Sequence, residues 1–235
     1  MSQESVIIFG GSSGIGEATA KRLLADGLRV VIVGRDRSRL EAAQSRLGGV
    51  ETASVDATDR AAVAAFFERV GSFQHLVLSI SGGRGAGPFR TLGLDDLRSG
   101  MEKKFFAQMT VAQCALSKLE GGSITFVSAG SARVATPGTA GLAAINGAIE
   151  AAVPTLAKEL APTRLNGVSP GVIDTPWWDA MPKQFKENAF KQTAERLPVR
   201  RVGRPEDVAQ AIAFLIHNSF VTGTVVEVDG GGHLG

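Results

Sequence analysis

Seven residues near the start of the chain have the types and spacing of a phosphate-binding turn. Residues 10–16 read Gly-Gly-Ser-Ser-Gly-Ile-Gly, after the apolar run 6–9 and before the amphipathic segment 17–25. Gly10 permits a sharp turn, Gly14 a close approach of backbone to a pyrophosphate, and Gly16 close packing of a helix on a strand. The helix that follows offers free N–H groups to an anion. This order predicts a dinucleotide site with contacts from Gly10, Ser12, Ser13, Gly14, Ile15 and Gly16.

The end of the second apolar run favours one of the two nicotinamide dinucleotides. A carboxylate at this position would bind the ribose hydroxyls of NAD, but the chain reads Val33-Gly34-Arg35. A guanidinium can pair with a 2'-phosphate through two parallel hydrogen bonds. We therefore expect NADP(H), bound in part by Arg35. Asp36 is the competing signal, and a solvated arginine at the start of a helix is the alternative interpretation of Arg35.

The hydrophobic pattern indicates the fold that positions these residues. Apolar runs recur at 6–9, 30–33, 76–78, 124–127 and 225–228, as in strands covered on both faces. Between them, segments such as 63–70 and 208–215 have apolar residues at helical spacing. The alternation predicts a single Rossmann-type α/β domain over residues 1–235, with a doubly wound parallel sheet in a three-layer α/β/α arrangement.

Composition excludes several functional classes. The formal net charge is +2, from 25 basic and 23 acidic residues, so we expect no binding to nucleic acid or to an anionic membrane. The first residues do not resemble a signal peptide and no uninterrupted apolar run approaches 18 residues, which predicts a cytoplasmic protein. The single cysteine, Cys114, excludes an internal disulfide. His75, His217 and His233 lack a carboxylate spacing typical of a metal site, so no metal is predicted.

These motifs, taken in order, resemble those of the short-chain dehydrogenase/reductase family over nearly the whole chain. Further matches are Val55-Asp56, residues 169–176 (SPGVIDTP), 201–209 (RVGRPEDVA) and 222–231 (TGTVVEVDGG). The resemblance implies a homodimer or homotetramer. It also implies that Asp56 contacts the adenine and that the turn 170–175 holds the nicotinamide carboxamide. The remaining cofactor contacts that it implies are Ala57, Ser79, Ser81, Asn146, Pro170, Gly171, Ile173 and Thr175.

The resemblance fails at the residues that perform the family's chemistry. The family uses a serine, a tyrosine, a lysine four residues after the tyrosine, and an asparagine on the preceding long helix. This chain contains no tyrosine at all. Alignment places Leu142 at the tyrosine, Asn146 at the lysine and Lys104 at the asparagine. The serine position falls on Ala129, with Ser128 or Ser131 as substitutes if the loop differs in length.

Lys104 is the candidate replacement for the missing acid, with Ser128 and Asn146 as further catalytic candidates. Burial would lower the pKa of the lysine towards neutral pH, and its ammonium would stabilise a developing alkoxide. The alternative is an ordinary solvated lysine on a charged helix surface. We expect an atypical NADP(H)-dependent oxidoreductase that reduces a ketone. The competing hypothesis is a catalytically inactive NADP(H)-binding sensor or partner subunit.

Substrate contacts are predicted from position and residue type. Trp177 follows the turn 170–175, Leu142 occupies the tyrosine position, and Arg84 lies in the glycine-rich loop 81–88. Aromatic and apolar groups there suit a small apolar or aromatic carbonyl compound. The alternatives are a tryptophan that belongs to the core and an arginine exposed to solvent. Pro154 falls inside the helix expected at 139–160, where it predicts a kink.

Overall fold

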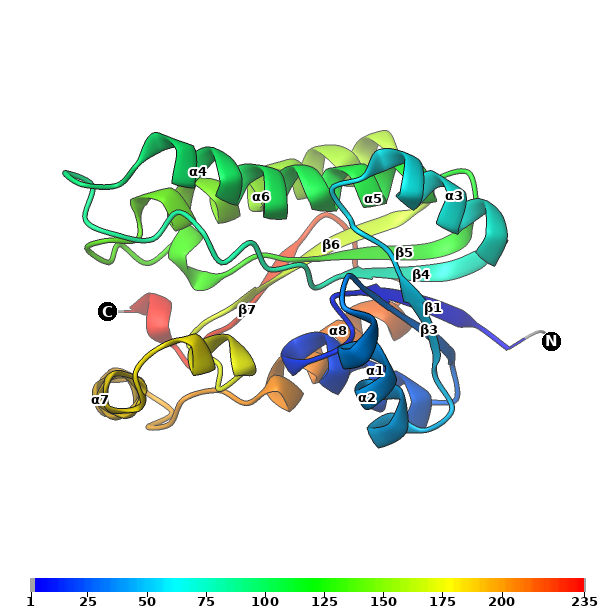
Figure 1. The fold of residues 1–235 in the computed structure, drawn as a ribbon. Helices are drawn as coiled ribbons and strands as arrows, with labels where there is room; N and C mark the ends of the chain where they lie inside the picture. Colours follow the sequence, from blue (N-terminus) through cyan, green and yellow to red (C-terminus); the bar gives the residue numbers. More distant parts are fainter. Residues whose placement is uncertain (1–2, 235) are drawn as a thin grey trace.

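The computed structural model describes residues 3–234, so Met1, Ser2 and Gly235 of the predicted domain lie outside the described residues. Its centre is a seven-stranded parallel sheet with the order β3-β2-β1-β4-β5-β6-β7 (Figure 1). The predicted Rossmann-type α/β fold is confirmed. The strands are β1 (Ser5–Phe9), β2 (Arg29–Gly34), β3 (Glu51–Ser54), β4 (Phe73–Leu78), β5 (Leu119–Val127), β6 (Arg164–Pro170) and β7 (Val225–Val228).

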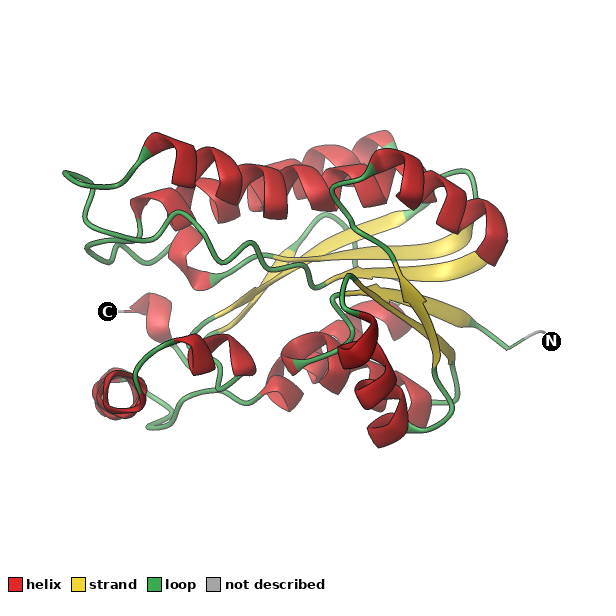
Figure 2. Cartoon of the chain, viewed as in Figure 1, coloured by secondary structure: helices red, strands yellow, loops and turns green. Residues whose placement is uncertain are grey.

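Helices cover both faces of the sheet, which completes the three layers (Figure 2). One face carries α1 (Gly14–Ala25), α2 (Arg37–Leu47) and α8 (Pro205–His217). The other carries α3 (Arg60–Val70), α4 (Leu94–Gly100), the π-helical turn η1 (Met101–Phe106), α5 (Ala107–Ala115) and α6 (Ala140–Glu159). The remaining helical segments are η2 (Gly130–Ala132), η3 (Pro176–Ala180), α7 (Lys183–Arg196) and η4 (Gly232–Leu234).

The strand order predicts a ligand crevice at one edge of the sheet. From β1 the chain builds outwards through β2 to β3, then returns to pair β4 with the other side of β1. At such a switch point the loops after the two central strands diverge to opposite faces, which opens a ligand crevice at the carboxyl ends. The predicted site residues of the turns after β1, β4, β5 and β6 therefore lie along one edge.

Strand β7 is less buried than its apolar sequence suggested. Its four residues are all half-buried, whereas β1 is buried throughout. The expectation that this run is covered on both faces is wrong, because β7 is the last strand in the sheet and pairs with β6 alone. Glu227 is accommodated within the strand for the same reason.

Helix α6 is the longest of the described helices and is strongly apolar. Among residues 3–234 it alone is long and apolar enough to cross a membrane, with a mean hydropathy of 1.3 in its best window. It contains no uninterrupted apolar run of that length, because Asn146, Glu150 and Pro154 lie within it. Its buried positions include Ile149, Val153 and Ala157, spaced one turn apart, which pack into the core on the sheet. This arrangement is that of a core helix. Pro154 lies inside the helix as predicted, and the kink itself remains a prediction.

Candidate active site

The turn after β1 has the close contacts that only glycine allows. Gly10 has a φ of 81°, and a Cβ there would lie 2.2 Å from the carbonyl oxygen of Ser79. A Cβ on Gly16 would lie 2.1 Å from the carbonyl oxygen of Gly10. The first contact brings the ends of β1 and β4 together, and the second presses α1 onto the turn. Gly10 and Gly16 thus have the geometry that their motif predicts.

The N-terminus of α1 opens towards the turn that follows β6. Ser13 is the N-cap in extended conformation, and no described side chain caps the helix from that position. The first-turn N–H groups are therefore available to an anion. A Cβ on Gly14 would lie 3.3 Å from Cβ of Thr175, so the turns 10–16 and 170–175 face each other. Ser12 and Ile15 lie in the same turn, partly exposed.

At the tip of β2, Asp36 and Arg35 have different surroundings. Asp36 is the N-cap of α2, and its Oδ1 accepts hydrogen bonds from Ser38 Oγ at 2.7 Å and from the Arg39 backbone N–H at 3.1 Å. The Ser38 hydrogen bond, followed by that from Arg39, holds the pKa of Asp36 below its usual value. Helix capping alone accounts for an aspartate at position 36, so no ribose contact is needed to explain it. Arg35 is exposed beside it.

Arg39 was missed by the sequence reasoning. Its guanidinium donates a hydrogen bond of 3.0 Å to Ser13 Oγ, so a second arginine reaches over the glycine turn from α2. Helical spacing could not have revealed it, since Arg35 lies between the end of β2 and the N-cap Asp36, outside α2. The guanidinium of Arg39 thus lies beside the N-terminus of α1, and that of Arg35 acts on Asp56 at the end of β3.

Asp56 follows β3, as expected, and is exposed next to the buried Ala57. Its Oδ1 accepts hydrogen bonds from the backbone N–H of Thr58 at 2.9 Å and from Thr58 Oγ1 at 2.8 Å. These bonds, the backbone one first, lower the pKa of Asp56, and the charge of Arg35 contributes as well. The carboxylate is therefore fixed at the crevice edge near Arg35.

The turn after β6 packs against the end of β7. The Gly171 N–H donates to the Val228 carbonyl oxygen at 3.1 Å, and a Cβ on Gly171 would lie 2.8 Å from Asp229. Ile173 is buried, and its carbonyl oxygen accepts a bond of 3.0 Å from Trp178 Nε1. Pro170 ends β6, and Ser81 lies exposed in the loop after β4. These residues line the crevice edge, and their cofactor contacts stay predictions.

Lys104 lies within the π-helical turn η1 at the carboxyl end of β5. Its Nζ donates a hydrogen bond of 3.1 Å to the backbone carbonyl of Ser128, and its Cβ lies 3.2 Å from a Cβ built on Gly82. Burial of the ammonium lowers the pKa of Lys104 to about 8, against an opposing effect of the Glu150 charge. The side chain is directed to the strand end instead of into open solvent. π-Helical turns of this kind occur frequently at functional sites.

Ser128 is tied to a carboxylate that the sequence analysis missed. Its Oγ donates to Glu150 Oε1 at 2.6 Å and lies 3.2 Å from the Val168 carbonyl oxygen. Glu150 Oε2 in turn accepts a bond of 2.8 Å from Arg133 Nε. A hydroxyl has a single proton, so the one on Ser128 is engaged by Glu150. The catalytic role of Ser128 remains a prediction, and Glu150 joins the candidate residues.

Asn146 is buried with one polar atom unused. Its Nδ2 donates to Ser131 Oγ at 3.1 Å and to the Leu142 carbonyl oxygen at 2.9 Å, which uses both amide protons. Among the described residues, Oδ1 is buried and has no hydrogen-bond partner. A buried acceptor without a donor is costly unless a ligand supplies one. The half-buried Leu142 lies one turn before Asn146 on α6.

Two of the three predicted substrate residues, Arg84 and Leu142, lie on segments that touch, since a Cβ on Gly141 would be 2.4 Å from the Gly85 carbonyl oxygen, whereas Trp177 lies in η3. Arg84 is 59% exposed and forms an ion pair of 3.1 Å with Asp96. Trp177 is 40% exposed and packs edge-to-face on Trp178, at 5.0 Å between ring centroids. A cleft of about 430 Å³ next to these rings is lined by Trp178 and not by Trp177. The other residues that line it are Asp174, Asp179, Met181, Lys183, Lys186, Glu187 and Phe190.

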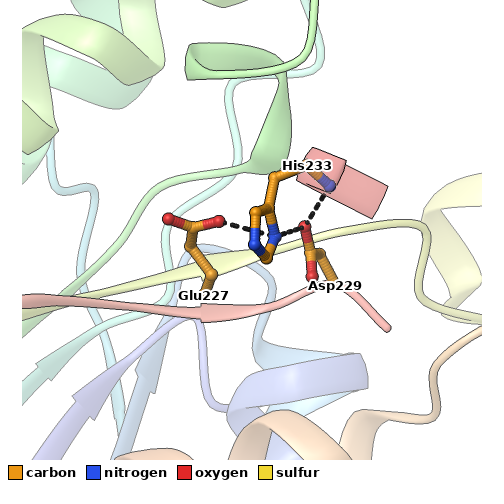
Figure 3. A group of neighbouring side chains, drawn as sticks. All are labelled: Glu227, Asp229 and His233. Atoms are coloured by element: carbon orange, nitrogen blue, oxygen red, sulfur yellow. Dashed lines mark hydrogen bonds and ion pairs between the residues drawn. The ribbon is translucent and has the colours of Figure 1, made fainter. Parts of the chain in front are cut away.

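A cluster at the end of β7 was also missed (Figure 3). His233 Nδ1 lies 2.8 Å from Glu227 Oε2 and 2.8 Å from Asp229 Oδ2. The three donor atoms lie within 4.8 Å of one another, close enough to hold a metal ion, so the argument from sequence spacing fails here. The absence of a metal remains a prediction. Arg133 Nη1 donates to Glu227 Oε1 at 2.6 Å, which joins the cluster to Glu150.

Comparison with known proteins gives consistent matches over the full length. The family model described as enoyl-(acyl carrier protein) reductase matches residues 10–233. A short-chain dehydrogenase/reductase of Stachybotrys chlorohalonatus is 31% identical, over 98% of this chain and 97% of that protein. The 3-oxoacyl-(acyl-carrier-protein) reductase of Rattus norvegicus is 32% identical, over 95% of each chain. A solved small-chain dehydrogenase in complex with NADPH has a TM-score of 0.89 and 34% identity, with 100% of both chains covered.

Proposed function

Because the chain belongs to the short-chain dehydrogenase/reductase family, we propose that it is an NADP(H)-dependent oxidoreductase acting on a small molecule. It reduces a carbonyl group, or oxidises the corresponding alcohol, with Lys104 in the proton-donating role that a tyrosine has in the family. The observation that carries this proposal is the position of Lys104. Its ammonium is held at the end of β5 by the Ser128 carbonyl and has a pKa of about 8.

The residues of the crevice fit a nicotinamide dinucleotide. The glycines of the turn 10–16 leave no room for side chains and the first turn of α1 has free N–H groups, as a pyrophosphate requires. The buried Oδ1 of Asn146 needs a donor, which a ribose hydroxyl would supply. When bound, the reduced nicotinamide supplies a hydride. The cofactor named for the solved relative is NADPH.

Reduction of a carbonyl also needs a proton on the carbonyl oxygen, and Lys104 is proposed to supply it. An ammonium group has three N–H donors, and the Ser128 carbonyl accepts one of them. The others are free to hydrogen-bond the substrate oxygen and to stabilise negative charge on it. A pKa near 8 suits proton transfer at neutral pH better than the pKa of an ordinary lysine does.

The proposed preference for NADP(H) over NAD(H) rests on two arginines. Arg35 and Arg39 are exposed near the glycine turn, and Arg39 already contacts Ser13. Asp36, the residue that would favour the unphosphorylated ribose, caps α2 instead. Two such guanidinium groups suit a 2'-phosphate dianion, since arginine pairs with phosphate through directed hydrogen bonds.

The substrate is proposed to be an apolar or aromatic carbonyl compound. Leu142 in place of tyrosine makes the site less polar, and the ring of Trp177 is partly exposed near the turn 170–175. A homodimer or homotetramer is proposed as the working assembly. Only 33% of the apolar window of α6 is buried within the chain, so a second copy would cover much of the remainder.

The test separates an enzyme from a binding protein. Fluorescence titration with NADPH and NADH measures cofactor affinity, and NADPH oxidation is then followed with quinones, aromatic ketones, small ketones and a 3-oxoacyl thioester. We expect tighter binding of NADPH and consumption above the protein-free rate with at least one carbonyl compound. Binding without consumption across the panel would favour the inactive sensor or partner subunit. No affinity for either cofactor would refute the proposal and the alternative together.

A further inference from the structure

We infer that Glu150 is a positioning residue that holds Lys104 in its charged form and fixes the turn after β5 against α6. This inference rests on the proposed function, in which Lys104 donates a proton. Glu150 lies on α6, one turn after Asn146, and its side chain is only 10% exposed. A carboxylate removed from water to this degree requires cationic or hydrogen-bonding partners.

The partners of Glu150 come from the two sides of its carboxylate. Ser128 Oγ donates to Oε1 at 2.6 Å, and Arg133 Nε donates to Oε2 at 2.8 Å. Ser128 is also the residue whose backbone carbonyl accepts the bond from Lys104. The carboxylate and the ammonium thus hold one residue from opposite ends, its hydroxyl and its carbonyl. Displacement of Ser128 would therefore move the Lys104 ammonium as well.

Glu150 is the carboxylate whose charge acts on the Lys104 ammonium. Burial disfavours the ammonium form, and the Glu150 charge is the effect that opposes burial. The neighbouring Lys103 acts on Asp56 and Asp96 instead. Arg84, in the facing loop, is paired with Asp96 at 3.1 Å. Without Glu150, the ammonium would stay buried with no compensating charge nearby, and its pKa would fall further.

Arg133 contacts the carboxylate whose charge acts on Lys104. Arg133 spans Glu150 and Glu227, with Nη1 donating to Glu227 Oε1 at 2.6 Å. Glu227 partly neutralises the guanidinium, which leaves more of the Glu150 charge to act on Lys104. Removal of the guanidinium should therefore strengthen the effect of Glu150 on Lys104, while removal of Glu150 should abolish it. The two changes have opposite signs, which structural damage would not produce.

The experiment measures the ionisation of Lys104 directly in the full-length protein. Lysine labelled with ¹³C at Cε is incorporated, the Lys104 signal is assigned by its loss in Lys104→Met, and its chemical shift is followed against pH. Glu150→Gln should lower the pKa of Lys104 by about one pH unit or more. Glu150→Asp should restore part of the difference, and Arg133→Met should raise the pKa. Glu159→Gln, an exposed carboxylate on the same helix, is the matched control and should change nothing.

The outcomes keep this inference separate from the proposed function. The titration of Lys104 requires no turnover, so it is informative even if no carbonyl substrate is found. If turnover is found, the alkaline limb of its pH profile should move with the Lys104 pKa in each variant. A Lys104 pKa that is the same in wild type, Glu150→Gln and Arg133→Met would overturn the inference. If Glu150→Gln does not fold, the direction of the shift in Arg133→Met and Glu150→Asp decides.

Discussion

The turns after β1 and β5 meet at the same edge of the sheet but are built on different principles. The first is defined by backbone contacts, with two glycines whose Cβ atoms would lie 2.1–2.2 Å from carbonyl oxygens. The second is defined by side chains, with Lys104, Ser128 and Glu150 joined by hydrogen bonds and charge. The first has the geometry that its glycine motif predicts, and the second is where the sequence predicts a departure from the family pattern.

The difference shows which part of a site can be rebuilt. A glycine in a contact of about 2 Å has no substitute, because any Cβ must displace the backbone. A side chain that places a proton has alternatives, because several ionisable groups can do so if burial and a counter-ion adjust their pKa. The glycine turn therefore tolerates fewer substitutions than the positions that carry the reacting groups.

The largest effect is expected from a substitution that disrupts the backbone contacts of the turn after β1. Gly16→Ala places a methyl group 2.1 Å from the Gly10 carbonyl oxygen, so α1 must move away from the turn. We expect the free energy of unfolding to fall by about 1–3 kcal/mol and NADPH affinity to fall more than tenfold. Denaturant unfolding and fluorescence titration measure the two quantities. Gly147→Ala is the control, since among the described atoms none lies within 4 Å of a Cβ there.

Lys104→Met tests the side-chain-defined turn. Turnover with any carbonyl substrate that is found should fall by about tenfold or more, the low end for a lost acid, while NADPH affinity stays the same. In the wild type, reduction should be constant below pH 8 and decline above it, because the ammonium donates the proton and has a pKa of about 8. Lys103→Met alters the exposed neighbour and should leave turnover unchanged. Equal turnover in both variants would exclude Lys104 as the donor.

Arg39→Met alters a side chain that contacts Ser13 in the turn after β1. Loss of a charged hydrogen bond to a phosphate should weaken NADPH binding by about tenfold and leave NADH binding unchanged. Arg37→Met is the control, because Arg37 is 85% exposed and pairs with Glu41 on its own helix. Titration of each variant with both cofactors measures the ratio. A parallel loss for NADH would indicate a change in the turn and not a phosphate contact.

The smallest expected effect concerns the cluster at the end of β7. The hydrogen bond to Asp229 raises the pKa of His233, so the charged form is favoured in the folded state. This contribution to stability is present below the unfolded pKa of about 6.5 and is lost as the pH rises through the folded value. His233→Gln should therefore lower the melting temperature by about 1 °C at pH 6 and by less at pH 9. A difference that does not depend on pH would contradict this assignment.

The sequence predicted what depends on neighbours along the chain. The order of strands and helices, the glycine turn and the helix across Pro205–His217 follow from residues a few positions apart. Asp36 shows the limit of such reasoning. Its type suggested a ribose ligand, but its position one residue before α2 makes it a helix cap. The capping geometry includes Ser38 and Arg39, which a comparison based on cofactor motifs does not consider.

The chain alone determined the sheet, the phosphate-binding turn and the absence of tyrosine, because periodicity, glycine spacing and composition are properties of the linear sequence. Only the tertiary structure decided what surrounds Lys104. Ser128 and Glu150 are 22 residues apart, Arg39 and Ser13 are 26 apart, and Arg133 and Glu227 are 94 apart. The pKa of a buried amine depends on the solvent it loses and the charges it meets in space. Both are set by how β5, α6 and β7 pack together, and neither is encoded in the spacing of any motif.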